Sequence, residues 1–387
     1  MAQSKTRLLV SNLLILAAIG LLVAIYYAPI WWVSLTAPNY PKEAFPDGVR
    51  IHFHMNGVFN GCKKVNKSEI TEEEALDCVH EMDTINHYVG MYPIAAGGVV
   101  ERAFSPFLVG LLIVMLLGFM CTRPKIRLLI MSIGFGAIAV WMAMTWYGGN
   151  GIALENAGYI SALVKALDQD TEKESAAQDS GNAIIERLKA SLEHSQTQTA
   201  SSADETITKQ DNIDHLKVTF EDSQKRLTAT ERQAWKGNVR QIMAWHYQMS
   251  LGRYFNNPAE IKPMVHNMRI AGDIVFWGIL AAMLLLLWGA RKSRGPLYWL
   301  MILVPMALPV FFIIEYSGWL WWYGHRLNDM GAFTVKPFMP TVFGDGKVAQ
   351  FTTHSYPYIG FFLMLLGAAL LAIAALMRFK MSRNGDG

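Results

Sequence analysis

Six long apolar stretches, more than any other feature, limit what this chain can fold into. A helix that crosses a bilayer needs roughly 20 predominantly apolar residues, and each stretch approaches that length. The stretches are Leu8–Ala28, Phe107–Cys121, Ile126–Tyr147, Ile270–Ala290, Pro296–Ile314 and Tyr358–Met377. Charged residues make up 17% of the chain, below the roughly 25% of soluble domains. We therefore predict an all-α polytopic membrane protein with six transmembrane helices.

The first stretch is predicted to be a retained transmembrane helix rather than a cleaved signal peptide. Its apolar run is longer than the roughly 7–15 residues of a signal peptide's hydrophobic region. It also ends in the bulky sequence YYAPIWW instead of a small-residue cleavage site.

Basic residues predict the orientation of the helices. They precede the first span, fill the turns between spans two and three and between spans four and five, and follow span six. They are Lys5, Arg7, Arg123, Lys125, Arg127, Arg291, Lys292, Arg294, Arg378, Lys380 and Arg383. Because loops rich in Lys and Arg stay cytoplasmic, the sequence predicts cytoplasmic N and C termini, in a bacterial inner membrane.

Three segments are then predicted on the periplasmic side. The chain divides into membrane parts at 1–28, 107–147, 270–314 and 358–387 and outer parts at 29–106, 148–269 and 315–357. Nine of the ten histidines fall clearly within the outer parts, and His266 lies near a membrane edge. This distribution predicts that the outer face carries the chemistry.

The first outer segment is predicted to be a small α+β unit. Apolar and polar residues alternate in VRIHFHM (49–55), which is typical of a strand and places His52 and His54 on one face. A capping box at Thr71 and Glu74 predicts the start of a helix over about 72 to 89. Steps of 100° place Glu73, His80, Asp83 and His87 on one stripe of that helix.

These histidines and the neighbouring methionines suggest a copper site. Thioether sulfur favours Cu(I), and imidazole is also a copper ligand. The candidate ligands are His52, His54, His80, His87, Asp83, Met55 and Met91, with Met82 as a further thioether. Asp83 would act as a ligand or orient an imidazole. The alternative is structural: the histidines hydrogen-bond one another and water, and the methionines pack.

Cys62 and Cys78 allow two interpretations. An oxidising compartment favours a disulfide, which would tie the turn after the strand to the helix; the alternative is a metal role for both thiolates. We predict the disulfide. Cys121, at the cytoplasmic edge, is expected to be inert.

The remaining outer segments differ in character. Residues 165–235 are polar, and the helical spacing of 182–194 and 213–235 predicts an exposed helical insertion with a mobile QTQTASSADET linker. The third segment is predicted to be loop-like. Secondary site candidates there are His325, Met330, Met339 and His354, together with Glu315 at the outer end of span five.

Several function classes lack support in the sequence. Phosphate loops, nucleophile elbows, HExxH and CxxCH motifs are absent. The predicted spans contain no histidine, which argues against a bis-histidine haem. A net charge of +3 gives no reason to expect nucleic acid as a partner.

Two stretches carry a resemblance to a known group of proteins. MDTINHYVGMYPI (82–94) and KPFMPTVFGDGKVAQFTTHSYP (336–357) resemble membrane proteins encoded alongside bacterial copper enzymes, in particular those of nitrous oxide reductase maturation clusters. The resemblance implies copper delivery or electron supply to a metalloenzyme on the outer face.

The sequence thus predicts a membrane accessory protein or subunit, not itself an enzyme, that handles copper for a periplasmic metalloenzyme partner. One alternative is a scaffolding subunit of a membrane complex, in which residues 148–269 dock a partner and the histidines are structural. A second alternative is a quinol-interacting redox subunit that uses Glu315, His325 or His354.

Overall fold

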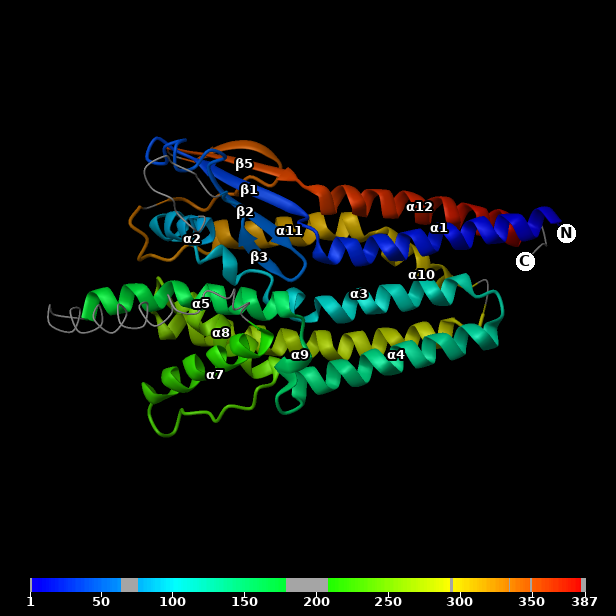
Figure 1. Ribbon diagram of the computed structural model, residues 1–387, viewed down its shortest axis with the longest axis horizontal. Helices are drawn as coiled ribbons and strands as arrows, with labels where there is room; N and C mark the ends of the chain where they lie inside the picture. The colour runs from blue at the N-terminus through cyan, green and yellow to red at the C-terminus, as the bar shows by residue number, and fades with distance from the viewer. Residues whose placement is uncertain are drawn as a thin grey trace, which may run out of the picture.

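The computed structural model describes residues 2–63, 76–178, 208–292, 295–333, 335–348 and 350–383. Long helices run side by side along the molecule, and both chain termini lie at one end (Figure 1). A β-sheet and the shorter helices α2, α5, α7 and α8 lie at the other end, which we call the sheet-bearing end.

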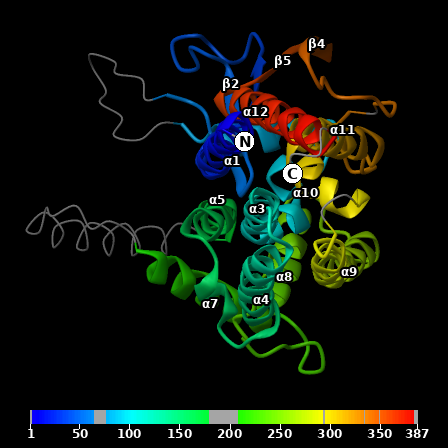
Figure 2. The ribbon, with the colours of Figure 1, turned by 90° about the vertical axis from the view of Figure 1, so that its right-hand side faces the viewer.

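Five helices are long and apolar enough to cross a bilayer, so the prediction of a multi-span membrane protein is confirmed. They are α1 (Ala2–Tyr27), α3 (Val99–Met120), α4 (Pro124–Tyr147), α9 (Pro258–Gly289) and α12 (Ile359–Arg383). In α3, 67% of the most apolar window is buried, against 28% in each of the others. The helix α3 is therefore the centre of the bundle, and the other helices surround it (Figure 2).

The predicted fifth span, Pro296–Ile314, is not one straight helix. It is broken into α10 (Pro296–Met306) and α11 (Leu308–His325), which meet at an angle of 63°. Pro305 and Pro309 flank the break, and proline both removes a backbone donor and clashes with the preceding turn. Counted as one broken span, the pair brings the total to six among the described residues.

The third outer segment is not loop-like, contrary to prediction. The helix α11 continues through its tryptophans to His325, and a hairpin of β4 (Gly344–Val348) and β5 (Phe351–Pro357) follows. This hairpin joins β1 (Trp31–Thr36), β2 (Val49–His54) and β3 (Gly57–Asn60) in a sheet of order β3-β2-β1-β5-β4. All four strand pairs of this sheet are antiparallel, so a five-stranded antiparallel sheet supplements the mostly helical fold.

The sheet is an extension of the two terminal helices. The helix α1 leads directly into β1, β5 leads directly into α12, and the two strands pair just as the two helices pack along each other. Trp31 is 2% exposed at this junction. Its indole contacts Phe312, Tyr316 and Phe361 and donates a hydrogen bond of 2.8 Å to the hydroxyl of Ser355.

The predicted disulfide between Cys62 and Cys78 is present. It ties the chain after β3 to the first residue of α2 (Cys78–Tyr88), whose N-terminus is capped by the Asp77 carboxylate. The predicted capping box at Thr71 and Glu74, with Glu73, lies outside the described residues.

Shorter helices complete the sheet-bearing end. They are η1 (Ile94–Ala96), η2 (Gly151–Leu154), α5 (Ala157–Gln178), α7 (Lys209–Lys225) and α8 (Val239–Gly252). The predicted helix over 213–235 ends at Lys225, and the residues up to Val239 are not helical. The predicted helix 182–194 and the QTQTASSADET linker lie outside the described residues.

Replacing both disulfide cysteines by serine, in C62S/C78S, should lower the free energy of unfolding by about 3 kcal/mol, because the disulfide closes a loop between cysteines 16 residues apart. Thermal unfolding in detergent, followed by circular dichroism, measures the effect. The matched control is C121S, since Cys121 is a free thiol; an equal loss in C121S would contradict the prediction.

Candidate functional site

The predicted metal ligands on β2 lie in two different surroundings. His52 stacks on Tyr358, with ring centroids 5.2 Å apart, and among the described residues its buried Nε2 has no hydrogen-bond partner. His54 packs edge-on against Phe59. Burial lowers the pKa of His52 to about 4, assisted by Arg50 and His54, and burial also lowers the pKa of His54. Both imidazoles are therefore neutral near pH 7.

The α2 histidines contact another part of the chain. The Nδ1 atom of His80 lies 3.0 Å from a guanidinium nitrogen of Arg253, and the His87 ring stacks on Tyr254 and packs against Phe255. These partners follow α8, whereas the partners of His52 and His54 belong to the sheet and the start of α12. The two histidine pairs thus have separate sets of neighbours.

Asp83 lies deeper than the α2 histidines, although Arg253, which contacts His80, also interacts with it electrostatically. It is fully buried, and its Oδ1 accepts a 2.6 Å hydrogen bond from the backbone N–H of Ile94. Burial raises the pKa of Asp83 to about 7, although the N–H of Ile94 opposes that shift. The carboxyl anchors η1 to α2, which is a structural role.

The methionine candidates also lie in different parts of the structure. Met82 and Met91 are buried in the core, whereas Met55 lies in the β2–β3 turn. Within the described ranges, no group of three or more His, Cys, Asp or Glu side chains is arranged to hold a metal ion.

The secondary candidates are similarly scattered. His325 stacks on Trp321, and its Nδ1 lies 2.8 Å from the carbonyl oxygen of that residue. His354 pairs with Asp345 across the β4–β5 hairpin at 2.6 Å. Met330 and Met339 are 63% and 46% exposed. Of these candidates, only Glu315 lines either of the two cavities described below.

The first of these cavities, which we call the inner cavity, has a volume of about 200 Å³ and lies among β2, α3, α11 and α12. Its apolar wall includes Leu108, Leu112, Leu308, Phe311, Phe312 and Met364. Its polar wall includes His54, Glu101, Arg102, Ser105 and Glu315. The inner cavity is therefore amphipathic, with an apolar part and a charged part.

The charged part is built at the start of α3. Gly98 precedes the helix with a φ of 61°, a left-handed conformation that favours glycine. An ideal Cβ there would lie 3.9 Å from Glu315 Oε1, so the start of α3 approaches Glu315 of α11 closely. Glu101 Oε1 accepts a 3.3 Å hydrogen bond from the indole of Trp319, which links the same two helices.

Arg102 supplies the positive charge beside these carboxylates. It is 8% exposed and interacts electrostatically with Glu101 and Glu315. Within the described part of the chain, its guanidinium makes one hydrogen bond, from Nε to the carbonyl oxygen of Gly98. Its two Nη atoms are not among the buried atoms that lack a partner, so they are accessible to a ligand or to water.

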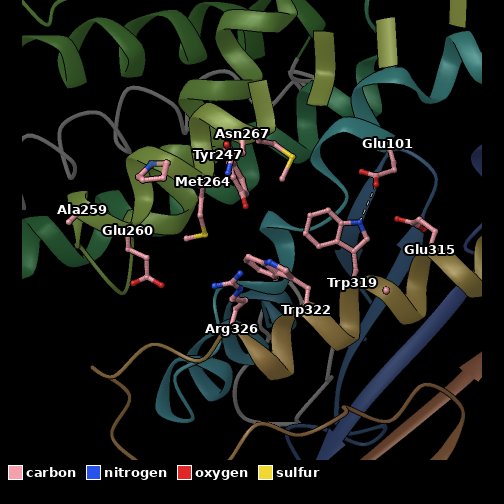
Figure 3. Close-up of a pocket in the computed structure, with 13 residues that line it drawn as sticks. Glu101, Tyr247, Ala259, Glu260, Met264, Asn267, Glu315, Trp319, Trp322 and Arg326 are labelled. Carbon is pink, nitrogen blue, oxygen red and sulfur yellow. Dashed lines mark hydrogen bonds between the residues drawn. The ribbon is translucent and has the colours of Figure 1, made fainter. Parts of the chain in front are cut away.

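A second, larger cavity adjoins the inner cavity and shares Glu101, Glu315 and Trp319 with it. This crevice has a volume of about 670 Å³ and is bounded by α3, α8, α9 and α11. Glu101 and Glu315 lie toward one end of the group of lining side chains, and Glu260 and Arg326 lie toward the other (Figure 3). Trp319, Trp322 and Met264 lie between them.

Sequence reasoning did not identify Glu101 and Arg102. They stand in VVERAFSPF, just before the apolar stretch that was predicted to begin at Phe107. The helix begins earlier, at Val99, and runs through Pro106. A charged pair directly preceding an apolar helix was the available signal.

Comparisons of the chain with protein-family models, with curated proteins and with solved structures found no match.

The raised pKa of Asp83 predicts a pH-dependent contribution to stability. Between the ordinary value of 3.8 and about 7, the folded protein keeps a proton that the unfolded chain releases. The free energy of unfolding of the wild type should therefore fall as pH rises through this window. In Asp83→Asn this contribution is absent, so the advantage of the wild type over the variant should shrink as pH rises.

Denaturant titrations of both proteins in detergent at several pH values between these limits measure this difference. The asparagine keeps an oxygen that can accept the hydrogen bond from the N–H of Ile94. The two proteins therefore differ in the titratable group and not in this hydrogen bond. Parallel pH profiles for the two proteins would contradict the assignment.

Proposed function

We propose that this membrane protein binds a lipid-soluble quinol in the inner cavity and acts as the quinol-interacting subunit of a redox complex. The observation that carries the proposal is the amphipathic lining of that cavity, in which Glu101, Arg102 and Glu315 meet an aromatic and aliphatic wall. Ligand pockets are typically apolar, with a few convergent polar groups that orient the ligand.

The chemistry of the lining fits a hydroxylated aromatic ring. A carboxylate accepts a hydrogen bond from a hydroxyl group, and a guanidinium donates to an oxygen. Phe53, Phe312 and Tyr316 offer ring faces and edges to an aromatic ligand. Neutral His54 lines the same cavity and can donate or accept.

Access from the bilayer is supported by the broken span. Phe311 lines the inner cavity and is also 61% exposed on the apolar helix α11. Exposed apolar side chains on a membrane helix face lipid, so the isoprenoid tail of a quinol would leave the cavity there. The 63° bend between α10 and α11 lies next to this position.

The distribution of basic residues supports an orientation with the sheet-bearing end in the periplasm of a bacterial inner membrane. In that orientation the inner cavity lies at the outer edge of the bilayer. A periplasmic or membrane metalloenzyme partner, as implied by the sequence resemblance, would take the electrons.

Replacing Glu315 by glutamine should weaken binding of a short-tailed quinol about tenfold or more, because hydrogen bonds to charged groups contribute about 1.5–3 kcal/mol. Titration calorimetry in detergent measures the dissociation constant. Glu43→Gln is the matched control, since Glu43 is exposed and lines neither cavity. Unchanged affinity in Glu315→Gln, or no binding by the wild type, would refute the proposal.

Copper handling is the second candidate, supported by one observation. The neutral His52 ring keeps a buried Nε2 without a hydrogen-bond partner in the described chain, close to His54 and followed by Met55. Neutral imidazole is the form that binds metal. The supported site is smaller than the predicted one, because it does not include His80, His87, Asp83 or Met91.

Titration with Cu(I) under reducing conditions tests this candidate. The variant His52→Ala/His54→Ala should lose copper uptake, whereas His80→Ala/His87→Ala should retain it, because those histidines contact other partners. Equal uptake by the wild type and His52→Ala/His54→Ala would exclude the site on β2.

A further inference from the structure

Glu101, Glu315 and Trp319 line both the inner cavity and the crevice. These three side chains therefore form a partition between the two spaces. One face of the partition meets the apolar wall of the inner cavity, and the other meets the crevice beside α9. A carboxyl group in this position can be reached from two sides.

The crevice opens toward water at the sheet-bearing end. Ala259, in the first turn of α9, and Arg326, directly after α11, are exposed and line it. Glu260, held by a 2.9 Å hydrogen bond from Asn328, adds a charged group at the same end. Along α11, Glu315 lies about 16 Å from Arg326, at roughly 1.5 Å per residue. The crevice spans that depth.

The partition contains an oxygen atom that has no hydrogen-bond partner among the described residues. Glu101 Oε1 accepts from Trp319, but its Oε2 is buried and has no hydrogen-bond partner in the described part of the chain. A buried carboxylate oxygen without a partner is costly. A proton on the Glu101 carboxyl would remove the charge that makes this burial costly.

We propose that Glu101 and Glu315 exchange protons with water through the crevice, while they contact the ligand from the inner cavity. This inference rests on the proposed quinol site and assigns its proton route. A proton that either carboxylate accepts in the inner cavity is passed to a crevice water molecule, which restores the carboxylate. The other charged or titratable groups that line the two cavities are Arg102, His54, Tyr316 and Tyr323 on the inner side and Glu260, Arg326 and Tyr247 on the crevice side.

Carbodiimide labelling of the full-length protein in proteoliposomes tests this route without any quinol. A water-soluble carbodiimide with the amine taurine converts a carboxyl group it can reach into an amide, which peptide mass spectrometry locates. We expect labelling of Glu101 or Glu315 in the wild type and its loss in Gly318→Trp. Gly318 lines the crevice only, and an added Cβ there meets no atom within 4 Å.

Gly278→Trp is the matched control, because Gly278 is equally open but lines neither cavity; it should be labelled like the wild type. Unlabelled carboxyls in the wild type, or equal labelling in Gly318→Trp, would overturn the route. A lipid-soluble carbodiimide reports separately on access through the inner cavity. If it fails while the water-soluble reagent succeeds, the lipid access of the proposed quinol site is wrong and the crevice route stands.

Discussion

The pairing of β1 with β5 is the interaction on which the architecture depends. It joins residues 324 positions apart, as the bond between Trp31 and Ser355 illustrates, and it continues the packing of α1 along α12. With the terminal helices fixed in this way, β2 and α11 come to lie against the same aromatic cluster around Trp31. Together with α3, these elements line the inner cavity, so its shape depends on the pairing.

The sequence was sufficient for features with a strong local signal. The length of the apolar stretches predicted the membrane helices, and the alternation of apolar and polar residues predicted β2. The two cysteines of the first outer segment predicted the disulfide. The sheet was not predictable in the same way, because antiparallel partners so distant in sequence leave no local pattern. The sequences of β4 (GDGKV) and β5 (FTTHSYP) are rich in turn-forming and polar residues, which favoured the prediction of a loop. In the fold, β5 forms a strand by pairing with β1.

Three residues of the candidate site were predicted from the sequence: Glu315, and His54 and Met55, which were predicted as metal ligands and line the inner cavity. The residues of the predicted stripe on α2 contact different parts of the chain. Arg253 contacts His80, Tyr254 stacks on His87, and the backbone N–H of η1 donates to Asp83. Glu101 and Arg102 were missed because the start of a buried helix cannot be separated from its flanking loop by hydropathy. Burying a single charged side chain at the start of such a helix costs free energy. Attraction between opposite charges and contact with water offset that cost.

The order of synthesis gives the β1–β5 pair another consequence. β1 is made before β5, so β1 keeps an open edge while the helices between them are inserted into the bilayer. Contacts of such long range close slowly, and an open edge readily pairs with foreign strands. Chains interrupted before β5 would expose this edge permanently, which would make them natural substrates for quality-control proteases of the membrane.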